Sequence, residues 1–376
     1  MLESMNKLRK HYVKQVTIGL LLAVAQLAST TWAQQPPTPS ILNYASPNAQ
    51  EISGLFWLVV GFSALVLLVV VVFMGAGIVQ ARRQAASGSE EEPPQIHGSL
   101  VLEVTWTLIP LAILGVLLVF TVRSLYALDG FAAPEDALHV NVTGQQFWWE
   151  MVYPEEGVVT ANELVVPVGR PVRVNLSSKD VMHSFWVPQL AGKTDLVPGN
   201  SRALWFTAER EGIYHGQCAE LCGDSHANMR FRVVALAPME YEAWVQAAQQ
   251  PSPAVSGQLA SRGEQLFITK GCVGCHAVQD VNTYNRVGPN LSHVGSRTAI
   301  AAGILPNTRE NMVRWLRYTD RVKPGVLMPN LGLSEDEAEA IAAYLEQRTL
   351  PGLDMRAIIE GRPYQSERLA DEGAGR

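Results

Sequence analysis

The sequence is poor in charge and has no excess of basic residues. Charged residues make up 17% of the 376-residue chain and hydrophobic residues 48%, and 29 Lys and Arg face 35 Asp and Glu, for a net charge of -6. Nucleic acid is therefore not an expected partner, because phosphate binding needs clustered Lys and Arg. The low charge favours a membrane protein, and the length allows two or three domains.

Cysteine is scarce as well. The four cysteines form two close pairs, Cys218 with Cys222 and Cys272 with Cys275. A disulfide framework needs cysteines spread along the chain, so this clustering points to metal binding or cofactor attachment. The chain also lacks internal repeats, which argues against a propeller or a solenoid.

Charge is absent altogether from residues 52–79 and 104–122. As helices with a rise of about 1.5 Å per residue, both stretches are long enough to cross a hydrocarbon layer of roughly 30 Å. We therefore expect a transmembrane hairpin domain over 34–130, with helices at about 53–79 and 104–124. Pro110 is compatible with a membrane helix, because neighbouring groups can satisfy the carbonyl that it frees.

Arg82 and Arg83 follow the first of these helices directly. The positive-inside rule then places the connecting loop in the cytoplasm and everything after Tyr126 outside. At the N-terminus, basic residues precede a short apolar stretch over 16–28, and Ala33 lies at a cleavage-like site, so we expect a signal peptide over 1–33. The alternative is a third membrane helix, but the apolar stretch is too short for one.

The external part of the chain changes character twice. Over 131–238, short strand-like pieces alternate with turn residues, which predicts an all-β domain built as a compact Greek-key barrel or sandwich. We expect a linker over 239–257, whose end is rich in Pro, Ser and Gly, then a helical domain over 258–350 and a polar, disordered tail over 351–376.

One loop near the end of the β domain gathers soft metal ligands. Cys218, Cys222, His226 and Met229 lie within twelve residues, and His183 can join them from a neighbouring strand end. Two thiolates, two imidazoles and a thioether suit two copper ions bridged by both sulfurs, whereas structural zinc has no use for Met. The alternatives are an external disulfide, one packed face of a helix, or a copper-delivery thiol site.

A second motif is Cys272-Val273-Gly274-Cys275-His276. A bare Cys-x-x-Cys could be a redox pair, but the His that follows it supplies an axial ligand, so the motif indicates covalent attachment of a c-type haem. An electron-carrying haem iron needs a second axial ligand, for which Met328 is the candidate. Met312 competes, but its position in an expected helix favours packing.

The pattern Cys-x-x-x-Cys-x-x-x-His-x-x-Met, with Asp-Val-Met-His-Ser-Phe upstream, resembles the CuA domain of cytochrome c oxidase subunit II, which has a cupredoxin fold. The resemblance implies that a binuclear copper centre is held by six residues, namely His183, Cys218, Glu220 through its carbonyl, Cys222, His226 and Met229. It also implies that the Glu220 carboxylate reaches a magnesium ion shared with subunit I. The helical domain resembles class I cytochromes c, in which the proline carbonyl at Pro289 holds the proximal His.

The resemblance extends to the hairpin and to an aromatic cluster. Leu102 to Pro110 is similar to the start of the family's second helix, where the acid at Glu103 lies at the mouth of a proton-uptake path. On physical grounds alone Glu103 could simply be an interfacial acid. Phe147, Trp148 and Trp149 resemble the aromatic cluster through which electrons reach the copper. Phe147 stands where relatives have Trp, so we expect Phe147 or Trp148 to accept electrons and Trp149 to pack in the core.

The sequence thus predicts a multidomain membrane protein with a helical hairpin, a cupredoxin-like domain and a cytochrome c domain. The resemblance implies the electron-accepting subunit of a caa-type, proton-pumping oxidase, located in the bacterial inner membrane with both cofactor domains on the periplasmic side. Its partners would be subunit I, other oxidase subunits and cytochrome c or another periplasmic donor. A copper-containing nitric oxide reductase subunit and a membrane-anchored copper-delivery protein are the rivals. Quinol-oxidising relatives are disfavoured because they lack the copper ligands.

Overall fold

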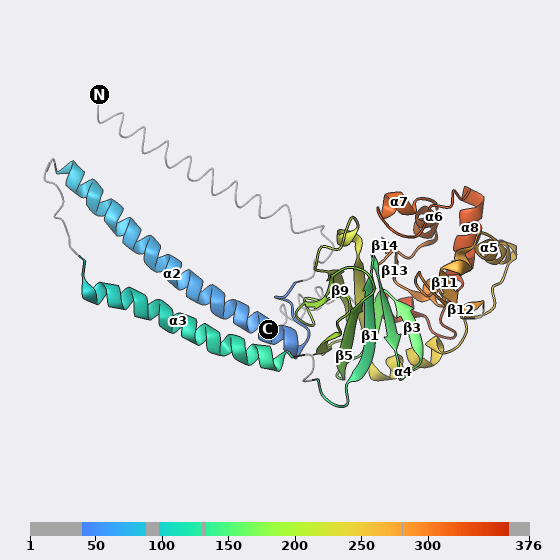
Figure 1. Cartoon of the computed structure of the whole chain (residues 1–376), viewed down its shortest axis with the longest axis horizontal. Helices are drawn as coiled ribbons and strands as arrows, with labels where there is room; N and C mark the ends of the chain where they lie inside the picture. Colours follow the sequence, from blue (N-terminus) through green and yellow to red (C-terminus); the bar gives the residue numbers. More distant parts are fainter. Residues whose placement is uncertain (1–39, 88–97, 130–132, 280, 361–376) are drawn as a thin grey trace, which may run out of the picture. The chain divides into compact units, whose positions relative to one another are not determined.

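A computed structural model describes residues 40–87, 98–129, 133–279 and 281–360. The expected signal peptide and the acidic loop between the membrane helices lie outside these residues. The hairpin consists of α2 (Pro47–Ala86) and α3 (Leu100–Ala127), which run side by side in Figure 1. Both helices are longer than the uncharged stretches, because Ser46 and Ser99 cap them one turn or more before those stretches begin. Most of their apolar side chains are exposed, as a lipid-facing hairpin requires.

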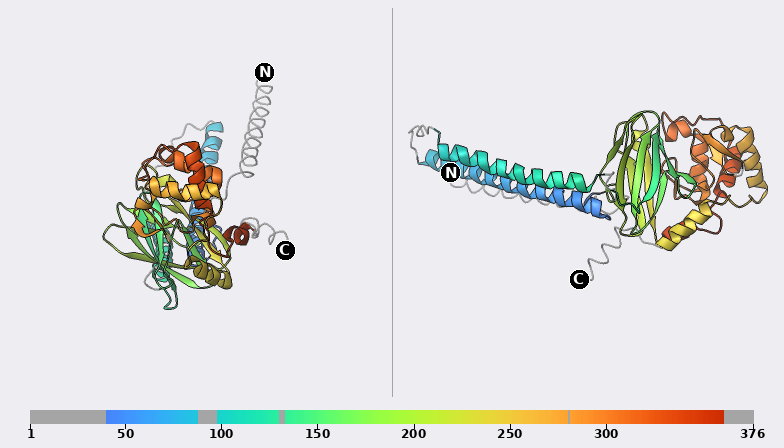
Figure 2. Two further views of the ribbon diagram at one scale, coloured as in Figure 1. Left: turned by 90° about the vertical axis from the view of Figure 1, so that its right-hand side faces the viewer. Right: turned by 60° about the horizontal axis from the view of Figure 1, so that its bottom comes forward.

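The β domain is a sandwich of two five-stranded sheets (Figure 2). The first sheet has the order β3 (Val158–Ala161), β2 (Trp148–Tyr153), β1 (Leu138–Gln145), β5 (Pro171–Ser178) and β8 (Arg202–Thr207). The second has the order β4 (Glu163–Pro167), β10 (Arg230–Leu236), β9 (Gly212–Cys218), β6 (His183–Trp186) and β7 (Thr194–Leu196). Both sheets are mixed, since β1 runs parallel to β5 and β4 parallel to β10.

The core of the sandwich is aromatic at the end that carries the metal-ligand motif. Trp149 is fully buried and meets Phe185 and Phe231 edge-on, with ring centroids 5.7 and 5.2 Å apart. Gly216 makes room for this packing, because a Cβ there would lie 2.3 Å from the Phe231 ring. Trp149 therefore packs in the core, as the sequence suggested.

Two segments outside the expected domain boundaries also join this core. Helix α4 (Pro238–Ala248) falls in the expected linker, yet it buries Tyr241 and Trp244 against the sandwich. Only residues 249–257 form the extended connection between the domains. Helix α9 (Met355–Glu360) falls in the expected disordered tail, yet Met355 packs into the same core. The expectation of disorder from 351 onward is therefore wrong for α9, because its apolar face has a surface to bury; residues 361–376 lie outside the described part.

The helical domain is built around α5 (Gln258–Thr269) and α8 (Glu335–Glu346), which cross closely at Gly263. A Cβ at Gly263 would lie 1.9 Å from the Ala340 carbonyl oxygen, so only glycine allows this approach. Ser334 and Glu337 form a capping box at the start of α8. The remaining described elements are α6 (Arg309–Arg317), α7 (Thr319–Val322), β11 (His276–Val278), β12 (Asn282–Arg286), β13 (Ala299–Ile300), β14 (Leu305–Pro306) and the 3-10 turns η2 (His226–Asn228), η3 (Cys272–Gly274) and η4 (Val294–Ser296).

Candidate functional site

The soft ligands of the β domain converge at one end of the second sheet. The Sγ atoms of Cys218 and Cys222 lie 3.9 Å apart. His183 Nδ1 lies 3.9 Å from Cys218 Sγ, and His226 Nδ1 lies 3.7 Å from Cys222 Sγ. Met229 Sδ is 3.8 Å from Cys222 Sγ. The two sulfurs thus have one imidazole on each side and a thioether close by.

Local structure brings these residues together. Strands β6 and β9 pair in antiparallel register, which places His183 at the start of β6 near Cys218 at the end of β9. The loop then turns at Gly223, whose φ of +127° favours glycine, and η2 returns His226 toward the sulfurs. The Glu220 carbonyl oxygen lies 3.3 Å from Cys218 Sγ, while its side chain is half-buried at the rim.

The electrostatics of the cluster suit a cation. The pKa of Cys218 is lowered, first by the hydrogen bond from the Cys222 thiol, and the pKa of Cys222 is raised because its partner sulfur holds the charge. Burial lowers the pKa of His183, but its hydrogen bonds with Cys218 and Asp180 outweigh burial and the net pKa is raised. A buried pair of sulfurs that carries one negative charge, beside two imidazoles, fits soft metal ions such as copper.

Two polar residues that sequence reasoning missed hold this cluster in place. Asp180 Oδ1 lies 2.8 Å from His183 Nε2, so the other ring nitrogen, Nδ1, faces the sulfur. Such a carboxylate fixes the orientation of a metal-binding imidazole. The Gln146 side chain donates to the Cys222 carbonyl at 2.5 Å, and its backbone N–H donates to Asp180 Oδ2 at 2.7 Å. Asp180 could have been suspected, because it stands only three residues before His183.

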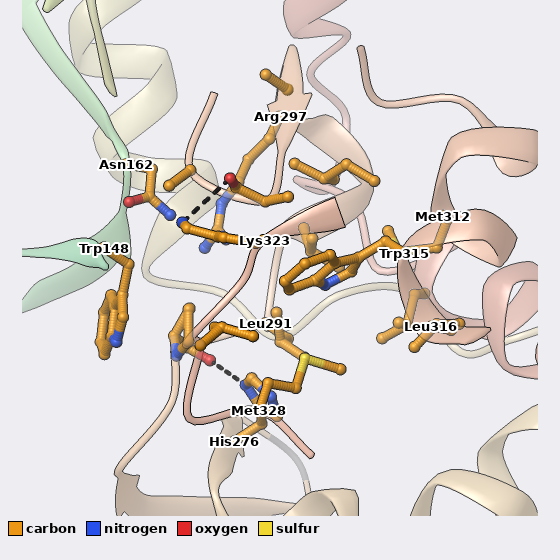
Figure 3. Close-up of a pocket in the computed structure, with 18 of the residues that line it drawn as sticks. Trp148, Asn162, His276, Leu291, Arg297, Met312, Trp315, Leu316, Lys323 and Met328 are labelled. Atoms are coloured by element: carbon orange, nitrogen blue, oxygen red, sulfur yellow. Dashed lines mark hydrogen bonds between the residues drawn. The ribbon is translucent and has the colours of Figure 1, made fainter. Parts of the chain in front are cut away.

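The second cluster surrounds a cavity that is lined mostly by residues of the helical domain. His276 and Met328 both line this cavity (Figure 3). His276 Nδ1 donates to the Pro289 carbonyl at 2.8 Å, as expected, which leaves Nε2 for a metal. Burial lowers the pKa of His276 and keeps the imidazole in the neutral form that binds iron.

The other cavity walls also fit a haem. Cys272 lines the cavity and Cys275 lies on its outer side, in a neighbouring hollow that His276 and Met328 share. Met312 is buried and lines the wall from α6, which agrees with a packing role. The buried guanidinium of Arg297 also lines the cavity and would suit the carboxylate groups of a haem. Sequence reasoning missed Arg297, since nothing marks a lone arginine as buried.

Residues of the β domain complete the same cavity. Phe147, Trp148 and Asn162 lie in its wall together with His276 and Met328, and Figure 3 shows Trp148 and Asn162 reaching in from the β domain. Phe147 and Trp148 are 2% and 8% exposed, so the helical domain covers the aromatic residues that were expected to accept electrons. Glu103 belongs to neither cluster: it is exposed in the first turn of α3.

Comparison with known proteins agrees with this architecture. Residues 31–125 match the family described as the transmembrane domain of cytochrome c oxidase subunit II, residues 156–236 match its periplasmic domain, and residues 260–349 match cytochrome c. Cytochrome c oxidase subunit 2 of Alkalihalophilus pseudofirmus is 39% identical over 309 residues, which cover 81% of this chain and 89% of that relative. The chain belongs to the cytochrome c oxidase subunit 2 family.

Other relatives are similar over smaller parts of this oxidase subunit. Cytochrome c oxidase subunit 2 of Bacillus subtilis is 37% identical over 284 residues, covering 70% of this chain and 79% of the relative. Quinol oxidase subunit 2 of the same organism is 34% identical over 219 residues, covering 57% of this chain and 68% of that relative. Among solved structures, the periplasmic domain of cytochrome oxidase subunit II from Bradyrhizobium japonicum shares 32% identity and covers 31% of this chain and 96% of that one, with a TM-score of 0.30.

The family assignment confirms the resemblance and the fold class. The oxidase subunit is a membrane protein with a periplasmic domain and a cytochrome c domain, and it takes part in electron transfer within a respiratory oxidase. The matched domains imply copper and haem as cofactors, and other oxidase subunits and a cytochrome c donor as partners.

Proposed function

We propose that this subunit receives electrons from cytochrome c or another periplasmic donor at a c-type haem and passes them to a binuclear copper centre and on to subunit I. Oxygen would be reduced to water in subunit I, with proton pumping across the bacterial inner membrane. Bound haem and bound copper would supply the one-electron redox chemistry, since no side chain in the two clusters transfers single electrons at ordinary potentials. The single observation that carries the proposal is the cavity wall that Phe147 and Trp148 share with His276 and Met328.

The positions of the side chains in the two clusters support the ligand roles. Cys272 and Cys275 would hold the haem through thioether bonds, and His276 and Met328 would bind its iron. The copper ligands would be His183, Cys218, the Glu220 carbonyl, Cys222, His226 and Met229. Asp180 would orient the His183 ligand, because its contact with Nε2 keeps Nδ1 turned toward the sulfurs.

The segment Gln146–Trp148 would join the two cofactor sites. Trp148 lines the haem cavity, and two bonds lead from Gln146 to the copper loops, one to the Cys222 carbonyl and one to Asp180. Trp148 and Phe147 would therefore accept electrons from the haem of the same chain, in place of a separate protein docked on the copper domain.

Three further assignments complete the proposal. The half-buried Glu220 carboxylate would take part in a magnesium site shared with subunit I. Glu103, at the start of α3, would open the proton-uptake path on the cytoplasmic side, where Arg82 and Arg83 at the end of α2 place that end of the hairpin. Both cofactor domains would then stand in the periplasm.

Metal quantification and electron paramagnetic resonance of the purified oxidase test this function. We expect two coppers in this subunit per covalent haem, with one unpaired electron shared by both coppers. Cys218→Ser should abolish the copper signal and keep the haem, whereas Cys272→Ser with Cys275→Ser should remove the covalent haem and keep the copper. Haem without the shared-electron signal in the unaltered protein would contradict the proposal.

A further inference from the structure

Lys323 is the most unusual residue of the contact between the two cofactor domains. It belongs to the helical domain, just after α7, and its side chain is buried, with the whole residue 2% exposed. Its Nζ donates to the Phe147 carbonyl of the β domain at 2.5 Å and to the Ala301 carbonyl of its own domain at 3.3 Å. A lysine is almost never buried without such partners, because the ammonium loses its hydration.

Burial is unfavourable for this lysine, so packing does not explain it. Desolvation lowers the pKa of Lys323 to about 7, which shows how poorly the site supports the charged form. An apolar side chain of the same length would fill the space without that cost. The group donates a hydrogen bond as an ammonium and as a neutral amine alike, so its contact with Phe147 does not depend on its protonation state.

The acceptor of this hydrogen bond lies in the segment that touches both cofactor sites. Phe147 and Trp148 form part of the haem cavity wall, and so does Lys323 itself (Figure 3). On the other side, Gln146 is bonded to the Cys222 carbonyl and to Asp180, which holds His183. A displacement of the Phe147 backbone would therefore change the distance from Trp148 to the haem site and the contacts of the copper loops together.

The residues after Lys323 contact the copper loop as well. The Ser225 hydroxyl donates to the Pro324 carbonyl at 2.6 Å, and Gly325 lies so close that a Cβ there would be 3.0 Å from Asp224. Lys323 thus stands at the end of a segment of the helical domain that lies along the loop carrying Cys222 and His226.

We propose that Lys323 is a positioning residue for electron transfer from haem to copper, which holds the Gln146–Trp148 segment of the copper domain against the haem cavity through the Phe147 carbonyl. This role rests on the proposed function, because it presupposes that electrons cross between the two domains of one chain.

Flash reduction of the haem in the intact oxidase, with the unaltered protein measured first, tests this role. In the unaltered protein, the copper should be reduced in a first-order phase at the rate at which the haem is reoxidised, which would support the proposed function. If this phase is absent, both the proposed function and the role of Lys323 are wrong. Lys323→Met, which keeps length and apolar bulk, should then slow the transfer about tenfold, the factor that corresponds to one lost hydrogen bond at the upper end of its usual range.

A matched control and two further readouts separate positioning from general damage. Arg314→Met removes an exposed basic side chain of α6 in the same domain, away from the haem cavity, and it should leave the transfer rate unchanged. In Lys323→Met, the optical spectra and midpoint potentials of both centres should equal those of the unaltered protein, and a small-molecule reductant should reduce the copper as fast as before. An unchanged transfer rate in Lys323→Met, or a loss explained entirely by a shifted potential, would overturn the role of Lys323.

Discussion

Glu163 offers the sharpest test of whether the helical domain is docked on the copper domain in the way described. Glu163 begins β4 of the copper domain and is 7% exposed. Its carboxylate accepts from the Thr298 N–H at 2.8 Å, the Thr298 hydroxyl at 2.5 Å and the Ala299 N–H at 3.2 Å, all in the helical domain. It also offsets the buried positive charge of Arg232 and Arg297.

Glu163→Ala would leave these donors without their acceptor in a buried contact. An unsatisfied buried donor costs about 1–3 kcal/mol, so the loss of the two backbone contacts predicts that docking weakens by about 2–6 kcal/mol. If the protected amides exchange through undocking, their hydrogen exchange should then accelerate by roughly 30- to 20,000-fold.

Hydrogen exchange of the intact oxidase, read by mass spectrometry on peptides that cover 298–303 and 228–232, measures this effect. The second peptide is informative because the Arg230 N–H donates to the Ala302 carbonyl across the same contact, at 3.1 Å. Glu155→Ala, at an exposed acid of the same domain, is the control and should leave both peptides unchanged. Unchanged exchange in Glu163→Ala, or an equal acceleration in Glu155→Ala, would refute the docking described here.

Three other changes probe the two sites and the helical domain. Met328→Ala should open a coordination position on the haem iron, so that the reduced protein binds carbon monoxide. Met312→Leu should not have this effect. If neither variant binds carbon monoxide, a residue other than Met328 is the second iron ligand. Asp180→Asn should weaken copper binding by about 10- to 100-fold, measured by chelator competition, because the ligating imidazole loses the carboxylate that orients it; unaltered affinity would contradict that part of the site. Gly263→Val should destabilise the helical domain by more than about 3 kcal/mol, since a Cβ at this position would overlap the Ala340 carbonyl. Thermal unfolding followed at the haem absorption band measures this loss. An unshifted unfolding curve would show that α5 and α8 do not cross at Gly263.

The sequence predicted the elements whose signals are local. The capping box at Ser334 and the long uncharged stretches are read directly from neighbouring residues, and α8 and the hairpin follow them. Strand β9, which carries Cys218, has no such local signal. Its sequence Gly-Ile-Tyr-His-Gly-Gln-Cys mixes glycines with polar residues, and the strand owes its stability to pairing with β6 and β10. Local propensity does not contain that tertiary contribution.

In the candidate site, too, residues that are close in sequence could be predicted, and residues brought together by distant contacts could not. Cys218, Cys222, His226 and Met229 are close in sequence, so they could be proposed as one set of ligands without a structure. Lys323 was not visible, because a lysine between Val322 and Pro324 reads as an exposed charge. Its burial depends on Phe147, which is 176 residues away in the chain and in another domain. Contacts between domains leave no periodic pattern in either partner, so they could not be predicted from the sequence.

Transfer between the two centres of one chain is the central claim, and flash reduction of the haem in the unaltered oxidase tests it most directly. The account predicts that the haem is reoxidised and the copper reduced in one first-order phase with the same rate constant, independent of protein concentration. A rate that rises with protein concentration, or copper reduction that proceeds while the haem stays reduced, would contradict it.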